Sequence, residues 1–131
     1  MGKDYTKWHG LKTKIEQSKR LREFSEREIW WCSISYNIGV ETDSKKKLFE
    51  RPVLVFKKFN SQMLWALPMT SQIRYGRYFL QIPVLGYKRT IMLSQLKIIS
   101  AQRLNRKITR ISKKEYWLVT RSIIKLIKRA P

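Results

Sequence analysis

The chain has 131 residues, a length that fits one domain with a short appendage better than two full domains. Lys and Arg number 29 against 9 Asp and Glu, which gives a formal charge of +20 and predicts a partner with dense negative charge. Hydrophobic residues make up 43% of the chain, too many for a disordered basic tail.

The positive charge is concentrated in the second part of the chain. Residues 1–50 hold 11 basic and 8 acidic residues, whereas residues 51–131 hold 18 basic residues and one acidic residue. A small domain needs a net charge of only about 2 to 8 for solubility. The excess therefore favours nucleic acid or an acidic protein as the partner.

Cysteine content and hydropathy indicate the cellular compartment of the protein. Cys32 is the single cysteine, so an internal disulfide is excluded. Lys3, Asp4 and Lys7 stand where a secretory signal would be apolar, and no run approaches the roughly 18 apolar residues of a membrane span. The expected location is the cytoplasm.

The first elements are a helix, a strand and a loop. Trp8, Leu11 and Ile15 recur at helical spacing within Thr6–Arg22, where Thr6 is placed as N-cap. Glu28–Tyr36 is rich in aromatic and β-branched residues and predicts a strand. We expect the polar stretch that follows, residues 37–50, to be a long surface loop.

Four apolar runs then alternate with turn residues, a pattern typical of a small antiparallel barrel. The turn residues are Asn60-Ser61, Tyr75-Gly76-Arg77 and Gly86-Tyr87. The runs are Pro52–Phe59, Met63–Met69, Tyr78–Val84 and Thr90–Ile99.

The last part of the chain predicts a turn, an edge strand and a helix. Ser100 is placed to cap a single turn through Leu104, and residues 107–111 follow as a final edge strand. Ser112-Lys113-Lys114-Glu115 has the spacing of a capping box. A stripe of period 3.6 then predicts a helix to about residue 128, its members being Tyr116, Val119, Ile123 and Ile127.

The sequence offers few side chains that could bind a metal ion. His9 and Cys32 have no zinc-type spacing, and the candidate magnesium ligands Glu41, Asp43 and Glu50 all lie in one loop. We therefore expect neither a metal nor another cofactor. Cleavage of RNA stays open, because the ribose 2′-OH is an internal nucleophile that needs only positioning, proton transfer and charge stabilisation.

Five short segments between residue 27 and about 128 carry a resemblance to a known family. They are Glu28-Ile29-Trp30-Trp31, residues 37–41 (NIGVE), residues 51–55 (RPVLV), residues 67–73 (LPMTSQI) and residues 93–104 (LSQLKIISAQRL). They stand in the order of the PemK/MazF family of toxin–antitoxin ribonucleases, with similar spacing, and resemble it. The resemblance implies a mainly β, SH3-like antiparallel barrel with a C-terminal helix, a homodimer, metal-independent cleavage of single-stranded RNA at short sequences, and an acidic antitoxin.

The same resemblance assigns candidate catalytic residues. Arg51 matches the catalytic arginine of the family and Thr70 its catalytic threonine. Glu41 matches an acidic loop residue that accepts the 2′-OH proton or reads a base, two roles that the sequence leaves open. The competing interpretations are a surface arginine at a strand start, a threonine chosen for β propensity and an ordinary loop charge.

Candidate RNA-binding residues surround these three. Gln72 and Gln95 match polar positions near the RNA groove of the family, where an amide binds a base edge or forms a buried hydrogen bond. Trp30, Trp31 and Trp65 are expected in the core or a dimer interface rather than as stacking platforms. The remaining RNA-binding candidates are Asn37, Lys45, Lys46, Lys47 and Arg74.

The predicted domain organisation is an N-terminal helical extension, residues 1–25, and a barrel domain with its C-terminal helix, residues 26–131. Three functions compete. The first is an endoribonuclease toxin. The second is a non-catalytic nucleic-acid-binding barrel, or a toxin of the same fold that acts on a protein such as gyrase. The third, a structural RNA-binding protein, rests on charge alone.

Overall fold

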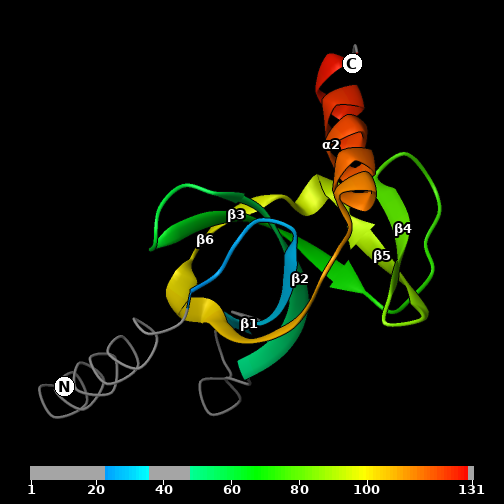
Figure 1. The fold of residues 1–131 in the computed structure, drawn as a ribbon. Coiled ribbons are helices and arrows are strands. Elements are labelled where there is room, and N and C mark those ends of the chain that lie inside the picture. The colour runs from blue at the N-terminus through cyan, green and yellow to red at the C-terminus, as the bar shows by residue number, and fades with distance from the viewer. Residues whose placement is uncertain (1–22, 36–47, 130–131) are drawn as a thin grey trace, which may run out of the picture.

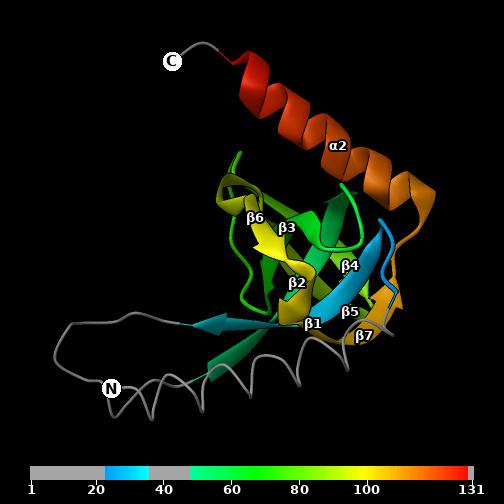
Figure 2. The same ribbon diagram turned by 90° about the vertical axis from the view of Figure 1, so that its left-hand side faces the viewer.

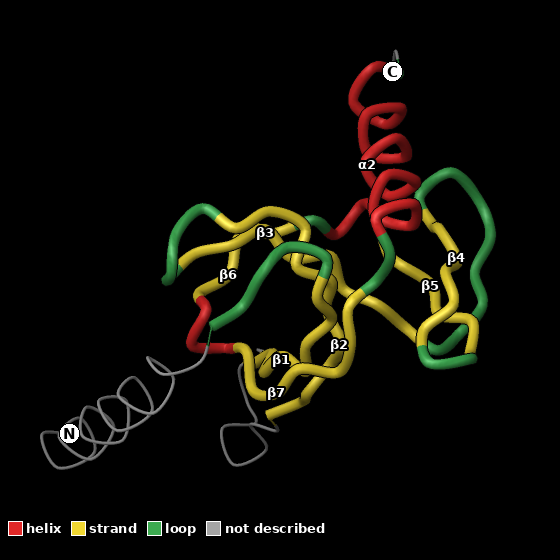
Figure 3. Tube along the Cα trace, viewed as in Figure 1, coloured by secondary structure: helices red, strands yellow, loops and turns green. Residues whose placement is uncertain are grey.

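The computed structural model describes residues 23–35 and 48–129, so the predicted helix Thr6–Arg22 and most of the predicted loop, residues 37–50, lie outside the described residues. Seven strands, two 3₁₀ turns and one helix make up the described part (Figures 1 and 3). Their bounds are β1 Glu28–Ser35, β2 Leu48–Lys58, β3 Met63–Thr70, β4 Phe79–Val84, β5 Tyr87–Met92, η2 Leu93–Gln95, β6 Lys97–Ser100, η3 Ala101–Arg103, β7 Leu104–Arg110 and α2 Lys113–Lys128.

The strands form one curled antiparallel sheet of half-barrel shape, and α2 rises from it (Figure 1). This confirms the predicted mainly β barrel with a C-terminal helix. The strand order is β4-β5-β3-β2-β1-β7, and β6 also pairs with β3. One edge of β3 is therefore shared: β6 pairs with its residues 63–66 and β5 with Met69 and Thr70.

The central strands are buried on both faces. In β2, Val53, Leu54, Val55 and Phe56 are all buried, and alternation sends successive side chains to opposite sides of the sheet. One cluster joins the sheet to α2 and includes Leu54, Phe56, Leu67, Met69, Val119 and Ile123. The other fills the curled interior and includes Trp30, Cys32, Val53, Val55, Leu64, Ala66 and Leu104.

Glu28 anchors the start of β1. Its carboxylate accepts hydrogen bonds from the Trp30 indole at 2.9 Å and the Ser25 N–H at 2.8 Å, and pairs with the Lys107 ammonium at 3.3 Å. Burial would raise the pKa of Glu28, but these hydrogen bonds and the Lys107 charge outweigh it and hold the pKa below its ordinary value. An ionised Glu28 thus ties β1 to β7.

Several sequence predictions about strand bounds are wrong. The run Thr90–Ile99 is not one strand: β5 ends at Met92, η2 follows, and β6 begins at Lys97. Buried Leu93 causes the break, because its N–H donates to the Tyr78 carbonyl at 2.8 Å and turns the chain along β3. The predicted loop through residue 50 is also too long, since β2 already begins at Leu48 and pairs with β1 there.

The hairpin between β4 and β5 turns one residue earlier than predicted. Leu85 and Gly86 both have positive φ, 51° and 85°, and Val84 pairs with Tyr87 on either side of them. Two consecutive positive φ values define the two-residue turn that matches the twist of a hairpin. Tyr87 is therefore a strand residue.

The last elements largely confirm the sequence. Ser100 caps η3 by accepting from the Gln102 N–H at 3.3 Å. The strand predicted from residue 107 begins earlier, at buried Leu104, and lies at the end of the strand order. In α2 the capping box is present, with both hydrogen bonds between Ser112 and Glu115 at 3.0 Å.

Helix α2 buries only part of its length. Val119 and Ile123 are buried, and the Tyr116 hydroxyl donates to the Phe56 carbonyl at 2.5 Å. Ile127, predicted to continue the stripe, is 77% exposed because the helix runs past the sheet (Figure 2). In the described part of the chain no helix combines the length and apolarity that crossing a membrane requires.

Candidate nucleic-acid interface

Arg51 and Thr70 lie at the same end of the β2–β3 pair. The last paired position there is Val53 with Pro68, and Arg51 and Thr70 each stand two residues beyond it on their own strand. Because side chains alternate, both lie on the face that carries Val53 and Ala66. Both are half-buried. The structure thus places at one end of a strand pair two residues that are 19 positions apart in the chain.

The Thr70 hydroxyl has a defined acceptor role. The backbone N–H of Gln72 donates to Thr70 Oγ1 at 3.2 Å, and the Arg74 guanidinium donates to Gln72 Oε1 at 2.9 Å. The Gln81 side-chain amide holds the Arg74 carbonyl. With an oxygen lone pair occupied in this way, the Thr70 hydroxyl keeps its hydrogen as a donor.

Gln95 approaches from the other edge of β3. It is exposed in η2, which joins β5 to β6, and both of these strands pair with β3. Gln72 and Arg74 are exposed in the loop after β3. Gln72 and Arg74 therefore lie close to Thr70, whereas Gln95 lies along the middle of β3, between the pairs Met69–Ile91 and Ala66–Lys97.

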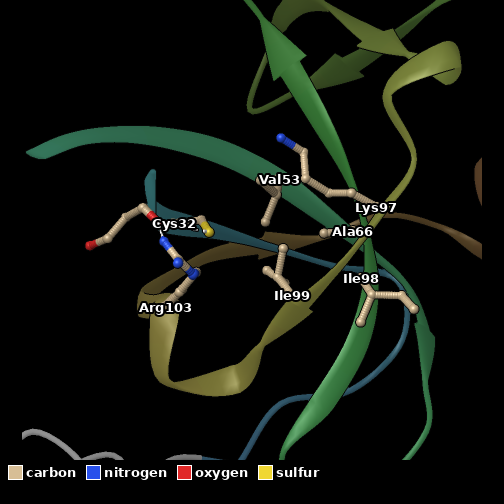
Figure 4. A pocket seen from close by; sticks show the side chains of 8 residues that line it. Cys32, Val53, Ala66, Lys97, Ile98, Ile99 and Arg103 are labelled. Atoms are coloured by element: carbon tan, nitrogen blue, oxygen red, sulfur yellow. Dashed lines mark hydrogen bonds between the residues drawn. The ribbon is translucent and has the colours of Figure 1, made fainter. Parts of the chain in front are cut away.

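A pocket of about 240 Å³ opens on the same face, and neighbours of Arg51, though not Arg51 itself, line it (Figure 4). Cys32, the register partner of Arg51, and Val53 form part of its apolar lining with Ala66 and Ile99. Lys97 and Arg103 also line it, and the Arg103 guanidinium donates to the Ser33 carbonyl at 3.4 Å. An apolar floor between two cations suits a nucleobase with its neighbouring phosphates.

Glu50, next to Arg51 in the chain, belongs to a separate cluster of side chains. It accepts from Asn105 Nδ2 at 2.8 Å and from both Arg106 terminal nitrogens at 3.3 Å. Asn105 also donates to the Ser33 hydroxyl at 2.7 Å. This fork neutralises one acidic charge near the pocket and holds β7 against β1 and β2.

The remaining sequence candidates, Asn37, Glu41 and Lys45–Lys47, lie outside the described residues. Within the described part, no three metal-ligating side chains converge. Trp30 is buried, whereas Trp31 and Trp65 are half-buried, with the Arg106 guanidinium 5.5 Å from a Trp31 ring centroid. Sequence reasoning missed Lys97 and Arg103. Only the register of β6 against β3 and the η3 turn bring them to the pocket.

Comparison with protein families identifies the family of this chain. Residues 25–127 match the family model of the PemK-like, MazF-like toxins of type II toxin–antitoxin systems. The chain belongs to this family. Its members are known as endoribonucleases, and the matched range covers every strand and nearly all of α2. No curated protein sequence matches the chain.

Solved structures of family members share the fold. MazF-mt6 of Mycobacterium tuberculosis has a TM-score of 0.59 at 14% identity, over 80% of this chain and 100% of that one. MazF of Deinococcus radiodurans gives 0.61 at 14% identity, over 82% and 99%. A chain from the MazE–MazF complex of D. radiodurans gives 0.64 at 14% identity, over 83% and 100%.

Proposed function

We propose that this PemK/MazF-family chain is a toxin that cleaves single-stranded RNA without a metal ion. The 2′-OH attacks the adjacent phosphate, and the products carry 2′,3′-cyclic phosphate and 5′-OH ends. The observation that supports the proposal is that Arg51 and Thr70 share one face at one end of the β2–β3 pair, beside a pocket with Lys97 and Arg103.

Arg51 stabilises the charge that develops on phosphorus. A guanidinium stays protonated at neutral pH, so it cannot serve as the base. Its fork of N–H donors fits the oxygens of a pentavalent phosphorane, whose charge is larger than that of the ground-state diester. The same group can protonate the leaving 5′ oxygen.

Thr70 orients the scissile phosphate. Its hydroxyl accepts from the Gln72 N–H and donates its hydrogen to a non-bridging phosphate oxygen. The loop that follows Thr70 is held to β4 through Gln81 and Arg74, so the hydroxyl is positioned before substrate binds. Such preorganisation lowers the barrier by avoiding reorganisation in the transition state.

The other candidates bind RNA or move the proton. Glu41 takes the 2′-OH proton or reads a base, and Gln72, Gln95 and Arg74 contact bases and phosphates around Thr70. Asn37 and Lys45–Lys47, which lie outside the described residues, contribute further RNA contacts in this proposal. The enzyme needs no cofactor and acts in the cytoplasm.

A homodimer and an acidic antitoxin complete the proposal. One fold neighbour is part of a MazE–MazF complex from D. radiodurans. The charge of this chain, +20, suits an acidic protein that covers the RNA-binding face and neutralises the toxin.

The test is to incubate the protein and its Arg51→Ala variant with a long single-stranded RNA in EDTA and to map the new ends. We expect discrete cuts with cyclic phosphate and 5′-OH ends from the parent. Arg51→Ala should lose about 10²–10³-fold in rate, the effect of removing one preorganised donor. Lys57→Ala removes an equal charge from the opposite end of the β2–β3 pair, where Lys57 pairs with Trp65, and should cut normally.

Two outcomes would contradict the proposal. Full cleavage by Arg51→Ala would remove Arg51 from the mechanism. Intact RNA across varied sequences, with a folded protein free of antitoxin, would move the function to binding or to a protein target; toxicity retained by a cleavage-dead variant would point to the protein target.

A further inference from the structure

The outer face of α2 carries a second groove, of about 560 Å³, away from the pocket next to Arg51. It is lined by Trp117, Arg121, Ile124, Lys125, Lys128 and Arg129. Residues three, four and seven apart share a face of a helix, and this face is opposite the one that buries Val119 and Ile123. Figure 2 shows the helix extending beyond the sheet, so the groove lies on a projecting arm.

Four of the six lining residues of the groove are cationic, and no acidic residue lines it. The only acidic residue after position 51 is Glu115, and its carboxylate accepts from the Ser112 N–H at the start of the helix. A second copy of this chain docked face to face would set this cationic groove against the same cationic groove of its partner. Like charges opposed in this way disfavour a dimer through this face.

Trp117 is the unusual member of the groove. Its side chain is 58% exposed, and the packing of α2 on the sheet is made by Tyr116, Val119 and Ile123 instead. An exposed indole next to Arg121, one turn along, offers a flat face for stacking beside a cation. Aromatic platforms flanked by basic side chains are how proteins bind single-stranded nucleic acid without sequence preference.

We propose that the outer face of α2 is an accessory binding site for single-stranded RNA, separate from the cleavage site. Trp117 stacks on a base, and Arg121, Lys125 and Lys128 contact the phosphates. An acidic helix would need several apolar anchors in the groove, but only Trp117 and Ile124 are apolar there. This proposal rests on the proposed function for its substrate class, because the groove would bind a second stretch of the same RNA that the cleavage site binds.

The test measures binding of a fluorescein-labelled 30-nucleotide 2′-O-methyl oligonucleotide, which lacks the attacking 2′-OH and stays intact. The variant Arg121→Glu/Lys125→Glu reverses two charges in the groove. The matched control Lys57→Glu/Lys88→Glu reverses two exposed charges on β2 and β5, so both variants have a formal charge of +16. Circular dichroism confirms that α2 is intact in each.

We expect the groove variant to lose about tenfold or more in affinity and the control less than about threefold. The dependence of affinity on salt should become shallower by about 1.4 in the log–log slope for the groove variant, as two phosphate contacts on a single strand predict. Trp117→Ala should weaken binding about fivefold or more, and Trp117→Phe less, because a smaller ring still stacks.

Equal losses in the groove and control variants would overturn the proposal, because the binding would then be general attraction to a basic protein. The proposal would also be overturned if Trp117→Ala left RNA binding unchanged and instead converted a dimer to a monomer in light scattering. It would be overturned likewise if Trp117→Ala left RNA binding unchanged and instead abolished binding to an acidic peptide.

The accessory site and the nuclease activity can be tested separately. Cleavage of an eight-nucleotide RNA by Arg121→Glu/Lys125→Glu should match the parent, because so short a strand is held at the cleavage site alone. Normal cleavage with normal long-RNA binding would overturn only the accessory site. Absence of cleavage in the parent with groove-dependent RNA binding would overturn only the nuclease.

Discussion

The sheet end that carries Arg51 and Thr70 and the outer face of α2 are both basic, but they are built differently. The first is assembled from strands distant in sequence, and its residues are half-buried and held by strand register and hydrogen bonds. The second comes from one continuous helix, and its residues are exposed. Positioned side chains suit catalysis, whereas exposed and adaptable ones suit binding that tolerates many sequences.

The largest expected effect comes from a substitution in the hydrophobic core beneath the first region. Leu54 is fully buried in β2, three residues after Arg51, and belongs to the cluster that joins the sheet to α2. Leu54→Ala should lower the free energy of unfolding by about 2–5 kcal/mol, because it removes apolar contacts and leaves a cavity. Urea denaturation measures this, and Leu118→Ala, at an exposed position of α2, is the control. Equal losses in both would mean that β2 is not the central core strand.

The next effect separates chemistry from scaffold at Thr70. Thr70→Val keeps the shape and the β propensity but removes the hydroxyl, so we expect cleavage to fall about 10²-fold or more with little change in stability. Thr70→Ser restores the hydroxyl and should recover most of the rate. Single-turnover cleavage of RNA distinguishes the two variants. Equal rates for Val and Ser would leave Thr70 a purely structural residue.

The stability of the sheet should depend on pH, because Glu28 stabilises the sheet and not α2. Its pKa is lowered in the fold from an ordinary value of 4.5, so its contribution to stability is fully present above that ordinary value. The contribution is lost as the pH falls through the lowered folded value. Urea midpoints measured from pH 7 to pH 3 should therefore decrease for the parent.

Glu28→Gln provides the control for that pH series. The amide oxygen can still accept from Trp30 and Ser25, while Lys107 and Arg110 are about half exposed and regain water. We expect a loss of about 1 kcal/mol at pH 7 and a smaller decrease on acidification than in the parent. The same decrease in both would assign the acid sensitivity to other carboxyl groups.

The smallest effect concerns the start of α2. Ser112→Ala removes the side-chain acceptor for the Glu115 N–H and should cost about 1 kcal/mol of stability. RNA cleavage should be unchanged, since the sheet end does not touch this cap. Ser112→Asp, which keeps an acceptor and adds a favourable charge at the helix start, should retain stability. A loss of cleavage in Ser112→Ala would show that the two regions are coupled.

Much of the fold follows from local signals in the sequence. The capping box Ser112–Glu115, the Ser100 turn and most strands are predicted because each depends on residues within a few positions of one another. The break at Leu93 and the end of the helical stripe before Ile127 are not predicted. Leu93 breaks the strand through its hydrogen bond to Tyr78, a residue distant in sequence. Ile127 is exposed because the helix runs past the sheet, whose strands are also distant in sequence.

The candidate site divides in the same way. The sequence alone identifies Arg51 and Thr70 through their motifs, and it determines the basic charge of the second part of the chain. Only the tertiary structure decides that the two residues share a face, that Lys97 and Arg103 line a pocket beside them, and that Trp117 is exposed. The physical reason is that motif and charge are properties of neighbours in the chain, whereas register, burial and pocket shape depend on which distant strands pair.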